Sequence, residues 1–248
     1  MNLKRFIAVL LLMIVFAGVY ATASKQPSRP ELLAGAKSIE SDEALQEWVN
    51  FYYLHPRPDL AVSAWKRMGQ SKLFAEESLR PGFVAFFGAL LKVNPSLGSQ
   101  LLAETRDSDS RYVLAYAAWI ADNDQGVKVL DALKAASPEG EKNGLKDLSY
   151  SEPPNLLEKP ITSPYDLDAL WSSFLATGDA RYIERITSTL TWGGKDEAAE
   201  FIGERARRTL VENGVNHPKV IEICKAELAT AKTPQKDLLE AVIKEAKQ

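Results

Sequence analysis

The sequence has 248 residues, of which 46% are hydrophobic and 25% are charged, and a formal net charge of −3. These values are typical of a globular protein with one or two domains, and a chain of this length can bury a core without disulfides or metals. Its 30 basic residues are balanced by 33 acidic ones and form no like-charged block. We therefore expect no nucleic-acid partner.

The N-terminal segment predicts export. Lys4 and Arg5 precede an uncharged apolar run over residues 6–19, and Ala21-Thr22-Ala23 supplies a cleavage pattern of small residues. These are the three parts of a secretory signal peptide, and the run is shorter than the ~20 apolar residues that span a membrane. We expect residues 1–23 to be removed as a signal peptide, which leaves no membrane span. A single cysteine and no usable N-glycosylation site favour a bacterial protein, periplasmic or secreted.

The first half of the remaining chain is predicted to be helical. Residues 24–37 are polar and contain two prolines, which predicts a flexible leader. An N-terminal helical block is expected over 38–136, because apolar residues recur there at helical spacing. Ser41 is a suitable N-cap for its first helix. The almost wholly apolar stretch 83–93 predicts a helix that is buried on all sides.

The second half of the chain is also predicted to be helical, after a segment that lacks helical periodicity. Residues 137–165 contain prolines and glycines with little periodicity, and we interpret them as a linker or a binding loop, with the linker favoured. Helical periodicity resumes over 166–248, the C-terminal helical block. No long strand-like alternation occurs, so we predict an all-α fold. Its form is an irregular solenoid of helix pairs or a compact helical bundle, and a faint similarity at a spacing of 56 residues favours a helical repeat.

Three stretches also carry a resemblance. They are 48–58 (WVNFYYLHPRP), 86–95 (FFGALLKVNP) and 166–186 (DLDALWSSFLATGDARYIERI). With these motifs the chain resembles a family of exported bacterial proteins that have a signal peptide and an all-helical body. The resemblance implies a fold and a destination, but no activity and no site residues, because none is assigned to that family.

Few side chains are suited to catalysis. His55 and His217 each precede a proline, which places both at helix boundaries, and Cys224 lies in an apolar stripe typical of a buried thiol. No spacing of His, Cys, Asp or Glu matches a metal site. We therefore assign no catalytic residue, no metal and no cofactor.

Two functions are weighed. The favoured one is an exported, non-catalytic helical scaffold or interaction module that binds a protein or peptide in a groove between helix pairs. The alternative is a small helical hydrolase that acts on envelope glycan through the paired carboxylates Asp166 and Asp168. A carrier of a small apolar ligand is a third reading, and the oligomeric state stays open. The candidate binding residues are Tyr53, Asp168, Trp171, Arg181 and Tyr182.

Overall fold

The computed structural model describes residues 28–194 and 196–247, and all regular secondary structure in these ranges is helical. The predicted signal peptide and residues 24–27 lie outside the described residues. The predicted all-α fold class is confirmed. The α-helices are α2 (Asp42–Asn50), α3 (Ala61–Gln70), α4 (Arg80–Val93), α5 (Leu97–Glu104), α6 (Ser108–Ala121), α7 (Asp124–Ala136), α8 (Glu139–Tyr150), α9 (Pro164–Thr177), α10 (Ala180–Thr187), α11 (Glu197–Asn216), α12 (Pro218–Leu228) and α13 (Gln235–Glu245).

The described part of the expected flexible leader packs against the helical body. Pro30–Leu32 form a short 3-10 helix, and the next residue, Leu33, is buried. The guanidinium of Arg57 donates hydrogen bonds to the carbonyl oxygens of Leu33 and Ala36, at 2.9 and 2.8 Å. Part of the segment expected to be a flexible leader thus contacts the helical body through one apolar side chain and two backbone carbonyls.

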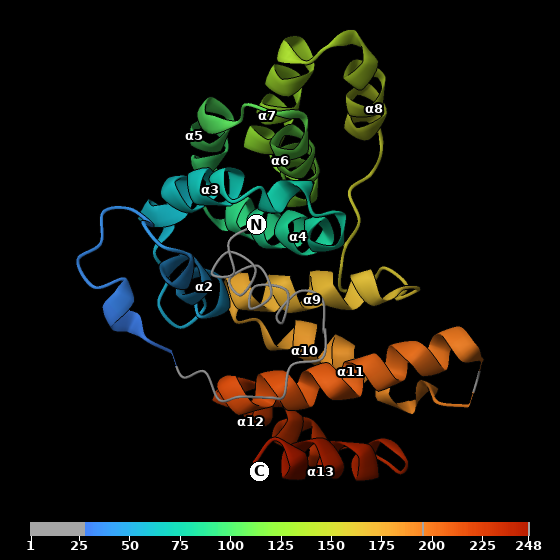
Figure 1. Cartoon of the computed structure of the whole chain (residues 1–248). Helices are drawn as coiled ribbons and strands as arrows, with labels where there is room; N and C mark the ends of the chain where they lie inside the picture. The colour runs from blue at the N-terminus through green and yellow to red at the C-terminus, as the bar shows by residue number, and fades with distance from the viewer. Residues whose placement is uncertain (1–27, 195, 248) are drawn as a thin grey trace.

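Helix α4 forms the centre of the fold because almost its whole surface is apolar. All residues from Gly82 to Leu91 are buried, as predicted for the stretch 83–93, but Lys92 and Val93 at the end of the helix are exposed. In Figure 1, α4 lies between α6 on one side and α9 on the other, and both pack along it. Gly88 allows α6 to approach closely, since a Cβ atom there would lie 3.0 Å from the side chain of Ile120.

Helices α6 and α7 form a tight hairpin. Asp122 adopts a left-handed backbone conformation at the end of α6, and the Asn123 side chain caps α7 by accepting a hydrogen bond from the Gly126 N–H. At Gly126 the two helices nearly touch, because a Cβ atom would lie 2.3 Å from the carbonyl oxygen of Ala118.

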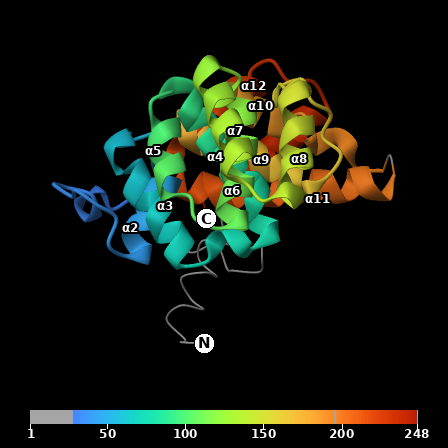
Figure 2. The ribbon, with the colours of Figure 1, turned by 90° about the horizontal axis from the view of Figure 1, so that it is seen from above.

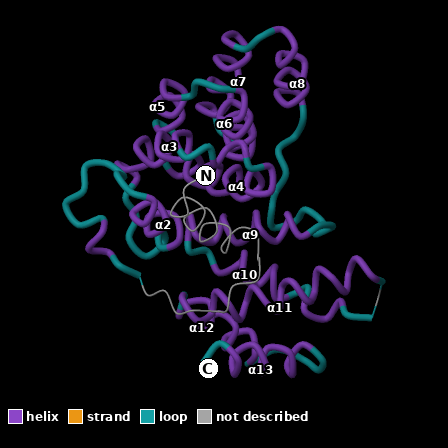
Figure 3. Tube along the Cα trace, in the orientation of Figure 1, coloured by secondary structure: helices purple, strands orange, loops and turns teal. Residues whose placement is uncertain are grey.

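The segment 137–165, interpreted as a linker or loop, contains helix α8. This helix lies beside α6 and α7 (Figure 2), where Arg111 forms an ion pair with Glu141 at 2.9 Å. Leu148 is its one buried residue, and Gly140 and Gly144 weaken its helical pattern, which explains why the sequence did not predict it. Residues 151–163 then form the irregular connection from α8 to α9 (Figure 3), hereafter the 151–163 segment.

The C-terminal helices continue from α9 on the side away from α4 (Figure 1). Helix α10 packs against α9, and α11, α12 and α13 pack against one another beyond it. One hydrophobic cluster runs through both predicted helical blocks, as in a compact helical fold. Within 28–194 and 196–247, no helix combines the length and the apolarity needed to cross a membrane.

Candidate functional site

Two of the five predicted binding residues lie in the core. Trp171 is 1% exposed, and its indole N–H donates a hydrogen bond to Thr209 Oγ1 at 3.0 Å. Asp168 is 3% exposed, and its carboxylate accepts hydrogen bonds from Nη2 of Arg205 at 2.8 and 3.1 Å. Burial raises the pKa of Asp168 to about 6, although the charge of Arg205 opposes this rise. These two residues join α9 to α11 and do not reach a surface that a partner would contact.

The other three predicted residues have separate surroundings. Arg181 is exposed and forms an ion pair with Asp179 at 2.5 Å. Tyr182 is half-buried, and burial raises the pKa of its hydroxyl. Tyr53 is also half-buried, and its ring packs 4.9 Å from that of Phe174. None of the five residues lines the pocket described below.

His217 and Cys224 are both buried. His217 follows the last residue of α11 and directly precedes α12, as expected for a helix-boundary histidine. It is buried, and burial lowers its pKa to about 4. Cys224 is fully buried, which confirms its predicted place in an apolar stripe, and burial raises its pKa to about 12. Neither group is therefore ionised near neutral pH.

The two carboxylates of the hydrolase alternative face different neighbours. Asp166 accepts hydrogen bonds from Lys159 Nζ at 2.7 Å and from the backbone N–H groups of Thr162 and Ser163 at 2.9 Å. Burial acts to raise the pKa of Asp166, but these hydrogen bonds outweigh it and lower that pKa. Asp168 instead faces Arg205. Each carboxylate thus has its own structural partner, and the two do not face a shared cleft.

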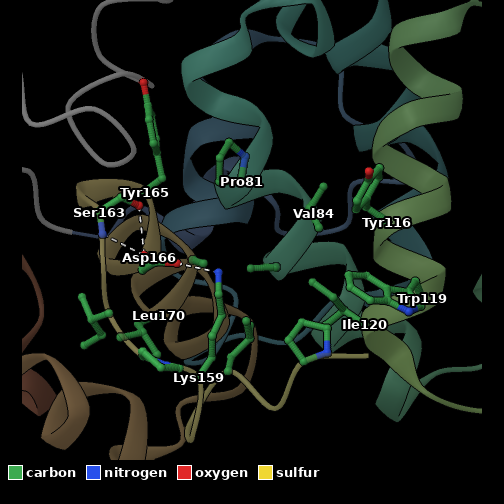
Figure 4. A pocket seen from close by; sticks show the side chains of 16 residues that line it. Pro81, Val84, Tyr116, Trp119, Ile120, Lys159, Ser163, Tyr165, Asp166 and Leu170 are labelled. Atoms are coloured by element: carbon green, nitrogen blue, oxygen red, sulfur yellow. Dashed lines mark hydrogen bonds and ion pairs between the residues drawn. The ribbon is translucent and has the colours of Figure 1, made fainter. Parts of the chain in front are cut away.

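An apolar pocket lies where the 151–163 segment crosses α4, α6 and α9, and we call it the central pocket. It has a volume of about 310 Å³ and is shown in Figure 4. Its lining residues are Pro81, Val84 and Ala85 from α4, Tyr116, Trp119 and Ile120 from α6, Pro154, Leu156, Lys159, Pro160, Ile161 and Ser163 from the 151–163 segment, and Tyr165, Asp166, Ala169 and Leu170 from α9.

One face of α6 carries a row of aromatic side chains, of which Tyr116 and Trp119 line the pocket. Tyr112, Tyr116 and Trp119 recur at i, i+4 and i+7, so they share one face of the helix. The ring centroids of Tyr112 and Tyr116 are 4.5 Å apart, and those of Tyr116 and Trp119 are 6.0 Å apart. The opposite face of α6, with Val113, packs into the core. We call these three residues the aromatic row.

The 151–163 segment is fixed at several points, so the pocket wall that it forms is preorganised. The indole N–H of Trp119 donates a hydrogen bond to the carbonyl oxygen of Ser151 at 3.0 Å. Ile161 is buried, and the ion pair of Lys159 with Asp166 closes the end of the segment against α9 (Figure 4). This ion pair is the charged end of an otherwise apolar cavity.

Sequence reasoning did not identify the central pocket. Two features of the sequence belong to it, the aromatic residues Tyr116 and Trp119 and the prolines of 137–165. The sequence favours a linker over a binding loop for 137–165, yet part of this segment lines the pocket. Nothing in the sequence shows that these segments meet beside Tyr165, whose side chain is 51% exposed at the rim of the pocket.

Comparison with protein-family models, curated protein sequences and solved structures finds no match to this chain. In the part of the chain that the structure describes, no group of three or more His, Cys, Asp or Glu residues is arranged to hold a metal ion. The function is therefore argued from the geometry of the central pocket.

Proposed function

We propose that this protein is an exported, non-catalytic binding module that holds apolar side chains of a partner polypeptide in the central pocket. The observation that carries the proposal is the composition of the pocket. Aliphatic, aromatic and proline side chains form nearly all of its wall, and a single ion pair, Lys159 with Asp166, lies at one end. Sites of this kind gain affinity by removing apolar surface from water.

The architecture supports a partner larger than a small molecule. A pocket that carries a small apolar ligand encloses most of that ligand's surface. Here the rim includes exposed residues of two walls, Tyr165 of α9 and Pro160 of the 151–163 segment. An open rim lined with aromatic side chains suits a side chain presented by a polypeptide, because aromatic residues are the usual anchors of such interfaces.

The hydrolase alternative is less well supported. The carboxylate of Asp166 faces the pocket, but five hydrogen bonds from Lys159, Thr162 and Ser163 occupy its oxygens and fix it as the cap of α9. A second carboxylate across the cleft would be needed for glycoside hydrolysis, and none appears among the lining residues. Turnover of purified peptidoglycan that Asp166→Asn abolishes would overturn the binding-module proposal.

The binding proposal is tested by selecting peptides on the purified protein from a displayed library of random peptides of about 12 residues. Titration calorimetry then compares the selected peptides on two variants. Ala169→Trp places a large side chain in the pocket, whereas Ala226→Trp places the same side chain on an exposed position of α12. We expect the first variant to lose binding and the second to retain it. Equal binding to both variants would contradict the proposal.

Export is part of the proposal and is tested separately. The signal rests on residues 1–23, which lie outside the described residues. The intact mass of the protein from its native host should correspond to a chain that begins at Ser24. A mass that retains Met1 would contradict export by cleavage.

A further inference from the structure

The dipeptide Asn-Gly occurs twice in the chain, once in α8 as Asn143-Gly144 and once in α11 as Asn213-Gly214. It is chemically labile, because glycine has no side chain to hinder attack by its own backbone nitrogen on the neighbouring asparagine side chain. The two copies share this chemistry. A difference in their reactivity must therefore come from the helices that hold them.

Helix α8 holds its copy weakly. Asn143 and Gly144 are both exposed, and no other element of the structure lies within 4 Å of a Cβ atom built on Gly144. Leu148 is the one buried residue of this helix, and its ion pair between Glu141 and Arg111 is partly exposed, so it contributes little to stability. Two glycines among its 12 residues also lower its helix propensity. We therefore expect α8 to open locally at a free-energy cost well below that of unfolding the whole protein.

Helix α11 holds the second copy firmly. Asn213 is 8% exposed, and its Nδ2 donates a hydrogen bond to the carbonyl oxygen of Thr209 at 2.9 Å. A Cβ atom on Gly214 would lie 2.6 Å from the side chain of Ile221 and 3.0 Å from that of Ala246. Both neighbours thus pack directly against this backbone. Freeing the dipeptide from its helix requires the separation of α11 from α12, which disrupts the core.

The deamidation of asparagine in such a dipeptide requires an open helix. The backbone nitrogen of Gly144 attacks Cγ of Asn143, so that the N–Cγ bond forms, the Cγ–Nδ2 bond breaks, and ammonia leaves with the proton of the Gly144 N–H. Water then opens the cyclic imide and leaves aspartate or isoaspartate at this position. In a helix that N–H donates to the carbonyl of residue i−4, and the helical backbone angles keep the nitrogen away from Cγ. The ring can therefore close only after α8 has opened.

We propose that Asn143 is a site of spontaneous deamidation and that its conversion irreversibly loosens α8. A carboxylate at this position is four residues from both Glu139 and Asp147, and like charges at this spacing weaken a helix. Isoaspartate routes the backbone through the side-chain methylene and interrupts the helical hydrogen bonds. Ser151, whose carbonyl oxygen accepts the hydrogen bond from Trp119, directly follows α8, so the loosened helix borders the central pocket.

The test is incubation of the purified protein in mildly alkaline buffer, once folded and once in urea, followed by peptide mapping with mass spectrometry. Deamidation appears as the mass difference between an amide and an acid at each asparagine. In the folded protein we expect Asn143 to convert at least about tenfold faster than Asn213, because α8 opens locally and α11 does not. In urea the two should convert at similar rates, since neither dipeptide is then held in a helix.

Gly140→Ala separates the opening of α8 from the chemistry of the dipeptide. The change lies outside the dipeptide and raises helix propensity, so it should slow the conversion of Asn143 in the folded protein about two- to fivefold and leave its rate in urea unchanged. Gly69→Ala is the matched control, because Gly69 lies in α3 and also has nothing within 4 Å of a built Cβ atom. It should leave the conversion of Asn143 unchanged.

Asn143→Asp reproduces the aspartate product and tests the loosening. It should speed the hydrogen exchange of the α8 amides and leave that of the α11 amides unchanged. Unchanged exchange across α8 would show that deamidation does not loosen this helix. The inference is also overturned if Asn143 in the folded protein stays intact as long as Asn213, or if Gly140→Ala leaves its conversion rate unchanged.

Discussion

The hydroxyl of Tyr53 and Nδ1 of His217 lie 3.2 Å apart, although 164 residues separate them in the sequence. This hydrogen bond joins the residues that follow α2 to the junction of α11 and α12. The backbone N–H of Tyr53 also donates to the carbonyl oxygen of Leu175 at 3.0 Å. The ring of Phe51 packs 5.0 Å from that of His217. The imidazole is thus enclosed by aromatic groups.

The burial of His217 predicts a loss of stability in mild acid. Its pKa is lowered to about 4 in the folded protein, against a reference value of about 6.5 for an unfolded chain. Between these values the unfolded state binds more protons, so stability is complete above pH 6.5 and falls as the pH decreases toward 4. We expect the free energy of unfolding, measured in urea, to be about 2 kcal/mol lower at pH 5 than at pH 7 from this group.

The control for this prediction compares the pH dependence of the unfolding free energy between wild type and a variant, rather than its absolute value. The raised pKa of Asp168 acts in the opposite direction, because between about pH 4 and pH 6 the folded state holds this proton while the unfolded chain has lost it, so its contribution to stability falls as the pH rises. The difference between wild type and His217→Gln isolates the histidine. If the unfolding free energy of His217→Gln depended on pH in the same way as that of the wild type, His217 would not be the group responsible.

Trp171→Ala should destabilise the fold by about 3–5 kcal/mol, which is the usual effect of deleting a fully buried aromatic side chain. The change removes an indole that is 1% exposed, and it also leaves Thr209 Oγ1 without the hydrogen bond that it accepts. Because total stability is about 5–15 kcal/mol, the melting temperature should fall by many degrees. Tyr150→Ala, on the surface, should shift it very little. A near-normal melting curve for Trp171→Ala would contradict the packing described here.

The ion pair of Asp168 and Arg205 predicts a non-additive result. Arg205→Met leaves the carboxylate of Asp168 buried without its cation and should cost about 3–5 kcal/mol near neutral pH. Asp168→Leu in the same chain removes that charge and should restore much of the loss, since apolar residues often replace a buried ion pair without penalty. Urea denaturation of the two single variants and the double variant measures this coupling. A double variant no more stable than Arg205→Met would count against it.

Two glycines should respond in opposite ways to the same substitution. At Gly126 a new Cβ would lie 2.3 Å from the backbone carbonyl oxygen of Ala118, so Gly126→Ala must push α6 and α7 apart and destabilise the protein. At Gly140 nothing lies within 4 Å, so Gly140→Ala should stabilise α8 by about 0.5–1 kcal/mol through its higher helix propensity. Thermal denaturation of both variants checks the signs. A stabilising Gly126→Ala would show that the hairpin is looser than described.

Local signals in the sequence were sufficient for most helix boundaries. Ser41 caps α2 by accepting a hydrogen bond from the Ala44 N–H, as its residue type predicts. The apolar character of 83–93 likewise indicated that the middle of α4 would be buried, although Val93 at its end is 62% exposed. Capping residues and apolar spacing involve only a few neighbouring residues, so they can be recognised in the sequence without a structure.

The features that the sequence did not predict depend on distant partners. Asp168 was predicted to be a binding residue, but its carboxylate is buried against Arg205, which is 37 residues away on α11. The central pocket likewise needs Trp119, Pro154 and Leu170, which come from three separate elements. No local sequence pattern indicates how α4, α6 and α9 pack together. The residues that line the pocket could therefore not be predicted from the sequence alone.

The packing of α4 against α9 has a consequence for the integrity of the molecule. Residues 151–163 are the covalent link between two halves that also meet through this helix pair and through Tyr53 and His217. Several positions in the link, such as Glu158, are exposed. A single peptide-bond cleavage there would separate the chain into two polypeptides without uncovering the core. The nicked molecule would remain one particle, and only a denaturant would release its two fragments.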